Sequence, residues 1–145
     1  MKKLIGILSL IACFSFTKGP EHPADATIYI YRTGQWNGAG NNWAMFVDEK
    51  KICKLSNNKY IKVTVPAGKH MISSKIGGVG MFKKETEIEI EAEAGGNYYV
   101  ACNIKTSFTR SRLEMLEVTK SSAEKQMKDM ALDNCQEDID AAAKQ

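Results

Sequence analysis

The stretch that decides the fold class is residues 87–93, Glu-Ile-Glu-Ile-Glu-Ala-Glu. Apolar side chains at 88, 90 and 92 alternate with glutamates, so the two kinds lie on opposite faces of an extended chain. Residues 60–65, Tyr-Ile-Lys-Val-Thr-Val, show the same alternation. A period of two predicts β-strands, each with one buried and one solvated face.

β-Branched and aromatic residues between turn residues mark further short strands. These strands are expected over residues 26–32, 43–47, 52–55, 70–73, 98–104 and 113–118. In the first of them, Ile28 and Ile30 share one face and the neighbouring tyrosines share the other. In the last, the apolar phase changes between Met115 and Leu116, which predicts a β-bulge. About seven such strands favour a mainly β fold, a small antiparallel β-sandwich.

The sequence period changes after residue 120. Ser121-Ser122-Ala123-Glu124 fits the capping box that begins many helices. Apolar residues then recur at helical spacing, at positions 123, 127, 130, 131, 135 and 139. We therefore expect one C-terminal α-helix over residues 121–145, after a β-sandwich domain over residues 24–120.

The first residues predict export. Met1-Lys2-Lys3 and the apolar run 4–12 form the charged and hydrophobic regions of a secretory signal peptide, residues 1–12. Leu10-Ile11-Ala12-Cys13 resembles the lipobox of bacterial lipoproteins, in which the cysteine is acylated and becomes the first residue. Cys13 and residues 13–23 are then a lipidated tether to the membrane. Phe14 takes the place of the Asp that retains many lipoproteins in the inner membrane, which favours the outer membrane, facing the periplasm or the cell surface. The alternative is an ordinary signal peptide and a soluble periplasmic protein.

Composition and charge exclude several classes of protein. The chain has 145 residues, 43% hydrophobic and 26% charged, which suits one globular domain. Its formal charge of +3 falls to about +1 without residues 1–12, since Lys2 and Lys3 are removed with them. So small a charge does not indicate a nucleic-acid partner. No apolar run approaches the ~20 residues that cross a bilayer as a helix.

Several ordered motifs carry a family resemblance. They are Ile-Tyr-Ile-Tyr-Arg at 28–32, Phe-Val-Asp at 46–48, Asn-Lys-Tyr at 58–60, Val-Pro-Ala-Gly-Lys-His at 65–70 and Ala-Gly-Gly-Asn-Tyr-Tyr-Val at 94–100. Over residues 24–120 the chain resembles the bacterial family of the domain of unknown function number 2846, whose members are often assigned as lipoproteins. The resemblance implies a cell-envelope location and a small PEGA-like β-sandwich, and it implies no activity. The family usually has Asp-Gly-Lys where this chain has Asp48-Glu49-Lys50, so a different turn type is expected there.

Catalytic and metal-binding patterns are weak in this sequence. The two histidines, His22 and His70, lie in the tether and beside a Pro-Ala-Gly turn, and there is no Cys-x-x-Cys or His-x-x-x-His pair. The glycine run at 77–80 lacks the Lys and Ser or Thr of a phosphate loop. We therefore expect no catalytic residues, no cofactor and no metal, and we interpret His70 as a turn histidine bonded to a carbonyl.

Three cysteines remain after Cys13. Cys53, Cys102 and Cys135 allow three single-disulfide pairings in an exported protein, and all three also suit buried thiols. The sequence alone leaves the pairing open.

The loop over residues 33–43 is the strongest candidate binding surface. It holds Trp36 among the amides of Asn37, Asn41 and Asn42. Exposed aromatic side chains are enriched at binding surfaces. We expect a non-catalytic binding or scaffolding protein with an envelope protein or a glycan as partner. The alternatives are a carbohydrate-binding module that uses the Trp36 loop, or a thiol or redox protein of the envelope.

Overall fold

The computed structural model describes residues 24–36, 40, 42–75, 87–106 and 111–143. The predicted signal peptide, Cys13 and the rest of the tether lie outside the described residues. The same holds for Asn37, Asn41 and the glycine run at 77–80.

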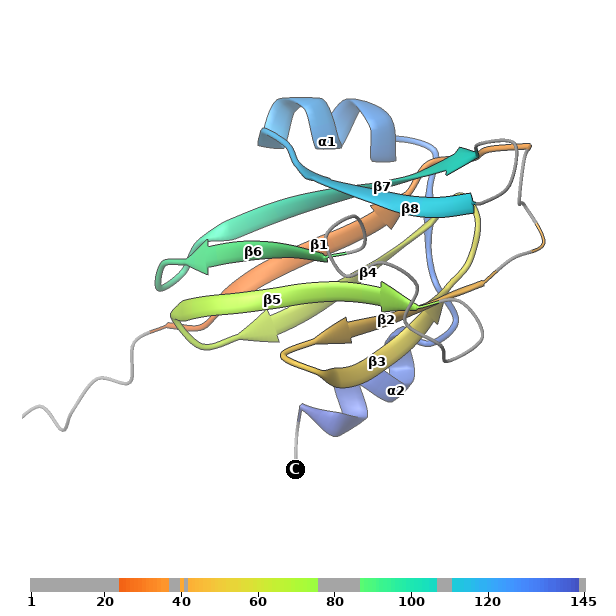
Figure 1. Cartoon of the computed structure of the whole chain (residues 1–145). Helices are drawn as coiled ribbons and strands as arrows, with labels where there is room; N and C mark the ends of the chain where they lie inside the picture. The colour runs from red at the N-terminus through yellow and green to blue at the C-terminus, as the bar shows by residue number, and fades with distance from the viewer. Residues whose placement is uncertain (1–23, 37–39, 41, 76–86, 107–110, 144–145) are drawn as a thin grey trace, which may run out of the picture.

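Two β-sheets face each other and form a sandwich (Figure 1). The five-stranded sheet has the order β8-β7-β1-β4-β9, and the four-stranded sheet has the order β3-β2-β5-β6. The strands are β1 (Ala26–Arg32), β2 (Trp43–Val47), β3 (Lys50–Leu55), β4 (Lys59–Val65), β5 (Gly68–Lys75), β6 (Glu87–Ala92), β7 (Asn97–Thr106), β8 (Ser111–Glu117) and β9 (Ala131–Leu132). The prediction of a mainly β sandwich is confirmed.

Strand pairing in the five-stranded sheet is mixed rather than wholly antiparallel. β1 pairs with β4 antiparallel but with β7 parallel, and the short β9 joins β4 in parallel. Between β1 and β7 the chain crosses to the four-stranded sheet and back twice, with β4 between the two crossings, and β7 runs in the same direction as β1. The four-stranded sheet is antiparallel and contains the predicted hairpin of β2 and β3.

The main hydrophobic core lies between the two sheets. Its fully buried members include Ile28, Ile30, Met45, Leu55, Ile61, Ile72, Ile90, Val100 and Leu113. A second cluster covers the outer face of the five-stranded sheet under helix α1 (Lys120–Met127) and includes Tyr31, Tyr99 and Ala123 (Figure 1). The predicted alternation in β1 is confirmed, because its isoleucines face the core while Tyr31 belongs to the cluster under α1.

The bulge in the described strands is in a different place from the predicted one. β7 and β8 keep one continuous register from residue 111 to 117, so the prediction of a bulge between Met115 and Leu116 is wrong. Leu116 is simply an outward-facing side chain, 49% exposed. The register instead shifts in the β2–β3 hairpin, where Met45 pairs with Cys53 but Phe46 pairs with Lys51, and Ile52 is the extra residue. The shift lets Ile52 pack against the core and leaves Lys51 exposed.

The β2–β3 turn is the two-residue type that Asp-Gly would form. Val47 pairs with Lys50, and the residues between them, Asp48 and Glu49, have φ values of 48° and 66°. Positive φ at both central positions is what a type I′ hairpin turn requires. The expectation of a different turn type is therefore wrong, and Glu49 occupies a conformation that glycine adopts more easily.

The C-terminal segment is two short helices rather than one continuous helix. α1 and α2 (Gln136–Ala142) are separated by β9, whose residues 131–132 pair with the edge of β4. Edge pairing and a covalent link at Cys135 override the helical spacing of the sequence. The helix α1 is capped two residues earlier than expected, by Thr119 in place of Ser121, and the Thr119 hydroxyl accepts a hydrogen bond from the Ser122 N–H. No helix of the described residues is both long and apolar enough to cross a membrane.

Candidate functional site

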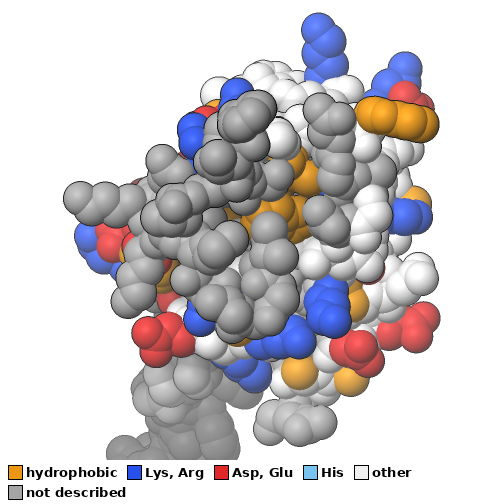
Figure 2. Space-filling view, turned by 45° about the vertical axis from the view of Figure 1, so that its right-hand side comes forward, with side chains coloured by type: hydrophobic (Ala, Val, Ile, Leu, Met, Phe, Trp, Pro, Cys, Tyr) orange, Lys and Arg blue, Asp and Glu red, His pale blue; other side chains and the backbone are white. Residues whose placement is uncertain are grey.

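The candidate binding loop presents its tryptophan to solvent. Trp36 is 95% exposed, the largest exposure among the large hydrophobic side chains that the structure describes. Trp36, Gln35, Ile104 and Thr106 line a shallow depression beyond the end of β1. Figure 2 turns the right-hand side of Figure 1 toward the viewer, and hydrophobic side chains are visible on this side, with lysine and arginine side chains near them. Asn42 is exposed on the same loop.

Gln35 fixes the residue before Trp36 to the sandwich. Its side-chain amide donates to the Ile104 carbonyl oxygen (3.3 Å) and accepts from the Ile104 N–H, so it pairs with both backbone groups of one β7 residue. Its own N–H donates to Asn57 Oδ1 at 3.1 Å. Three bonds therefore hold Gln35 where β1 has already ended, and Trp36 projects from an anchored backbone.

Cys53 and Cys135 form a disulfide, with their Cα atoms 5.9 Å apart and a sequence separation of 82. The bond joins β3 to the residue just before α2. Cys102 is a free, buried cysteine in the core. Burial raises the pKa of the Cys102 thiol to about 12, and the Arg32 guanidinium opposes this rise only in part. Cys102 is thus a protonated thiol at neutral pH and not a nucleophile.

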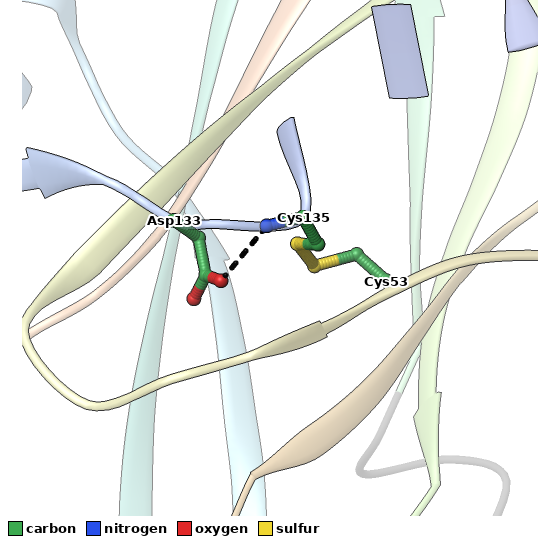
Figure 3. Close-up of side chains that lie close together, drawn as sticks. All are labelled: Cys53, Asp133 and Cys135. Atoms are coloured by element: carbon green, nitrogen blue, oxygen red, sulfur yellow. Dashed lines mark hydrogen bonds between the residues drawn. A yellow bond between two sulfur atoms is a disulfide. The ribbon is translucent and has the colours of Figure 1, made fainter. Parts of the chain in front are cut away.

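Asp133 lies beside the disulfide (Figure 3). Ligand atoms of Cys53, Asp133 and Cys135 fall within 4.8 Å of one another, the one such group found among the residues that the structure describes. Both carboxylate oxygens of Asp133 are already used: Oδ1 accepts from the Cys135 N–H (3.3 Å) and Oδ2 from the Ser56 N–H (2.7 Å). Because a disulfide offers no thiolate, this arrangement fastens the start of α2 to the β3–β4 turn and is not a metal centre while the disulfide is intact.

His70 is buried, only 7% exposed, and both of its ring nitrogens are engaged. Nδ1 lies 2.7 Å from Asp48 Oδ2, and Nε2 lies 2.9 Å from the Pro66 carbonyl oxygen. Both partners are acceptors, so the ring that donates to both of them is a charged imidazolium. The interpretation of His70 as a turn histidine bonded to a carbonyl is confirmed, and Asp48 is the partner that sequence reasoning missed.

The pKa values of this pair shift in opposite directions. Burial alone would lower the pKa of His70, but the hydrogen bonds to Asp48 and Pro66 and the Asp48 charge raise it above its ordinary value. Burial would raise the pKa of Asp48, but hydrogen bonds from His70 and the Met71 N–H, with the His70 charge, lower it. The pair fastens the β2–β3 turn to the β4–β5 turn and leaves no ring nitrogen for a metal or a substrate.

These features define a small β-sandwich that contains a disulfide. Cys53 and Cys135 form that bond, Cys102 is buried in the core, and both ring nitrogens of His70 are hydrogen-bonded. The chain belongs to a family of proteins of unknown function, DUF2846, whose family model matches residues 23–114. Comparison with curated proteins gives no match. The family match ends within β8, so α1, β9, α2 and the disulfide partner Cys135 lie beyond the matched residues.

Proposed function

We propose that this chain is an exported cell-envelope protein, anchored to the outer membrane by acylated Cys13, with a non-catalytic binding role centred on Trp36. The observation that carries the binding role is the 95% exposure of Trp36 next to the triply bonded Gln35. Tryptophan is enriched among the side chains that dominate binding energies. An anchored neighbour reduces the entropy lost when the indole is immobilised by a partner.

The position of β1 between the predicted anchor and Trp36 supports both parts of the proposal. In the sequence, the predicted tether precedes Ala26 at the start of β1, and Trp36 follows Arg32 at its end. A strand of seven residues spans roughly 20 Å. A lipid anchor on the tether would therefore hold one end of the sandwich near the membrane and direct Trp36 away from it.

The disulfide supports export, since such bonds persist in oxidising compartments and are rare in the cytosol. The state of the other polar groups supports a non-catalytic role. Cys102 is protonated at neutral pH, and His70 has both nitrogens bonded. A redox role for Cys102 finds no support in this environment.

The partner we propose is an envelope protein, with a glycan as the second candidate. A glycan is favoured by the combination of an exposed indole, which can stack on a sugar ring, with the exposed amide of Asn42 on the same loop. We propose no nucleic-acid partner.

The binding role is tested by comparing Trp36→Ala with Leu116→Ala, which removes another exposed hydrophobic side chain, on β8. Affinity purification and glycan-array profiles of the anchored protein should lose their specific signal in Trp36→Ala, by about 30-fold for an interface dominated by this residue. Leu116→Ala should keep it. Identical profiles for the parent and both variants would contradict the proposal.

The anchor is tested separately by the intact mass of the protein from membrane fractions. The proposal expects an N-terminus at acylated Cys13 that disappears in Cys13→Ser. An unacylated N-terminus beyond Cys13, for example at Phe16, would contradict the anchor without bearing on Trp36.

A further inference from the structure

An apolar groove opens on the side of the sandwich where β3 and β4 are bridged by α2. It has a volume of about 370 Å³, within the range of small-molecule sites. Its apolar lining consists of Val47, Ile52, Val63, Val65 and Ile139, with Ala142 and Ala143 at the end of α2. Four of these side chains belong to the main core, so the groove extends the hydrophobic interior to the surface.

Two local features keep this space open. The bulge in β3 turns Ile52 toward the core, which extends the apolar lining. α2 is held at its start by the disulfide and by Gln136, whose amide accepts from the Lys62 N–H (2.8 Å) and donates to the Lys62 carbonyl oxygen (3.0 Å). Its other end carries only alanines over the groove, and these are too small to fill it. Protein interiors are close-packed, so an apolar hollow of this size is suited to an apolar ligand.

The charges at the groove define the ligand further. Lys50 and Lys51 line it and are exposed, and neither has an ion pair with another described residue. Asp138 is also at the rim, while Asp48 is bonded to His70. Two adjacent cations against one available carboxylate favour an anionic head group.

We propose that this groove binds one fatty acid, with the hydrocarbon chain along the valines and isoleucines and the carboxylate toward Lys50 and Lys51. A hydrocarbon chain replaces water on the apolar walls, and the lysines pair with the head group. This site lies apart from Trp36 and requires no lipid anchor.

The test uses the mature chain, residues 13–145, exported behind an ordinary signal peptide and carrying Cys13→Ser so that it bears no acyl group. Titration calorimetry with sodium dodecanoate should give one site per chain. Dodecyl maltoside, which has a hydrocarbon chain of nearly the same length and an uncharged head, should bind at least about tenfold more weakly. Absence of dodecanoate binding, or equal binding of the two amphiphiles, would overturn the proposal.

Variants locate the site. Ala142→Trp fills the groove and should weaken dodecanoate binding at least about tenfold, while Lys50→Gln with Lys51→Gln should weaken it about fivefold. Lys54→Gln, an exposed lysine on the same strand that does not line the groove, should bind as the parent does. Circular dichroism checks folding, and Ala143→Trp is the second filling variant if Ala142→Trp unfolds. Unchanged affinity in a folded filling variant would place the fatty acid elsewhere and refute the site.

Discussion

The two ends of the sandwich are built differently. At the end where β1 begins, the β2–β3 and β4–β5 turns are joined by His70 and Asp48, and the ring of His70 is almost fully buried. At the Trp36 end, Gln35 also joins distant segments, yet it leaves the next side chain almost fully exposed. Both ends use a polar side chain to fasten turns, but only one displays a large apolar group. We therefore expect the His70–Asp48 pair to contribute to stability and the Trp36 end to serve recognition.

The disulfide provides the largest expected effect on stability. Cys53→Ala with Cys135→Ala should lower the free energy of unfolding by about 4 kcal/mol, because the bond closes a loop of 82 residues. Urea unfolding of the oxidised parent and the variant measures this difference. α2 should loosen, while acrylamide quenching of Trp36 fluorescence, in a Trp43→Phe background, should stay the same. An unchanged free energy of unfolding would show that the bond adds nothing to the native fold.

His70→Gln should lower the free energy of unfolding by about 1.5 kcal/mol, since the Asp48 carboxylate and the Pro66 carbonyl lose a charged donor held on a buried ring. Partner binding through Trp36 should be unchanged, because His70 lies at the opposite end of the sandwich. If His70→Gln lost partner binding but kept the free energy of unfolding of the parent, His70 would serve recognition and not stability, and the comparison of the two ends would be wrong.

The same pair predicts how stability depends on pH. The folded pKa of His70 is raised, so its contribution is present below the ordinary value of about 6.5 and is lost as the pH rises through the folded value. The folded pKa of Asp48 is lowered, so its contribution is present above about 4 and is lost as the pH falls. Urea unfolding should show the largest difference between parent and His70→Gln between about pH 4 and 6.5. A difference that is constant from pH 4 to 9 would exclude a charged His70.

Gln35→Leu should cost about 1 kcal/mol of stability, because the Ile104 N–H and carbonyl lose their side-chain partner. It should also weaken partner binding several-fold, because Trp36 is then displayed from a less restrained backbone. Gln136→Leu, which removes the matching pair of bonds to Lys62, is the control and should leave partner binding unchanged. If Gln35→Leu and Gln136→Leu changed partner binding equally, Gln35 would have no specific role in displaying Trp36.

Glu49→Gly is expected to give the smallest effect, a gain of about 0.5 kcal/mol in the free energy of unfolding. The φ of 66° at Glu49 is strained for a residue with a Cβ atom and free of strain for glycine. Glu49→Ala keeps the Cβ and should bring no gain. Thermal unfolding midpoints of the two variants give the comparison, and equal midpoints would mean that the turn is unstrained.

The strands could be predicted from the sequence because a period of two depends only on neighbouring residues and one buried face. The C-terminal segment could not, since the pairing of residues 131–132 with β4 and the bond from Cys135 to Cys53 are tertiary contacts that helical spacing does not reveal. Cys135 follows β9, which pairs with β4, whereas Cys102 lies on β7, two strands from β4 in the same sheet, and the sequence does not reveal this order.

The candidate sites show the same limit. Trp36 can be identified from the sequence because it lies in a polar loop that lacks the apolar–polar alternation of a strand. The bonds of Gln35 to Ile104 and of His70 to Asp48 join residues that are 69 and 22 positions apart, and only the sheet order brings them together. The fatty-acid groove depends on a bulge, a short helix and two alanines, none of which has a sequence pattern of its own.

The difference between the two ends is tested most directly by photo-crosslinking in the producing cell. A benzophenone amino acid placed at position 36 in one full-length variant, and at position 49 in another, reports what each end touches. We expect position 36 to link to a protein or glycan of the envelope and position 49 to link to membrane lipid. Lipid adducts at position 36, or the same adducts at both positions, would contradict it.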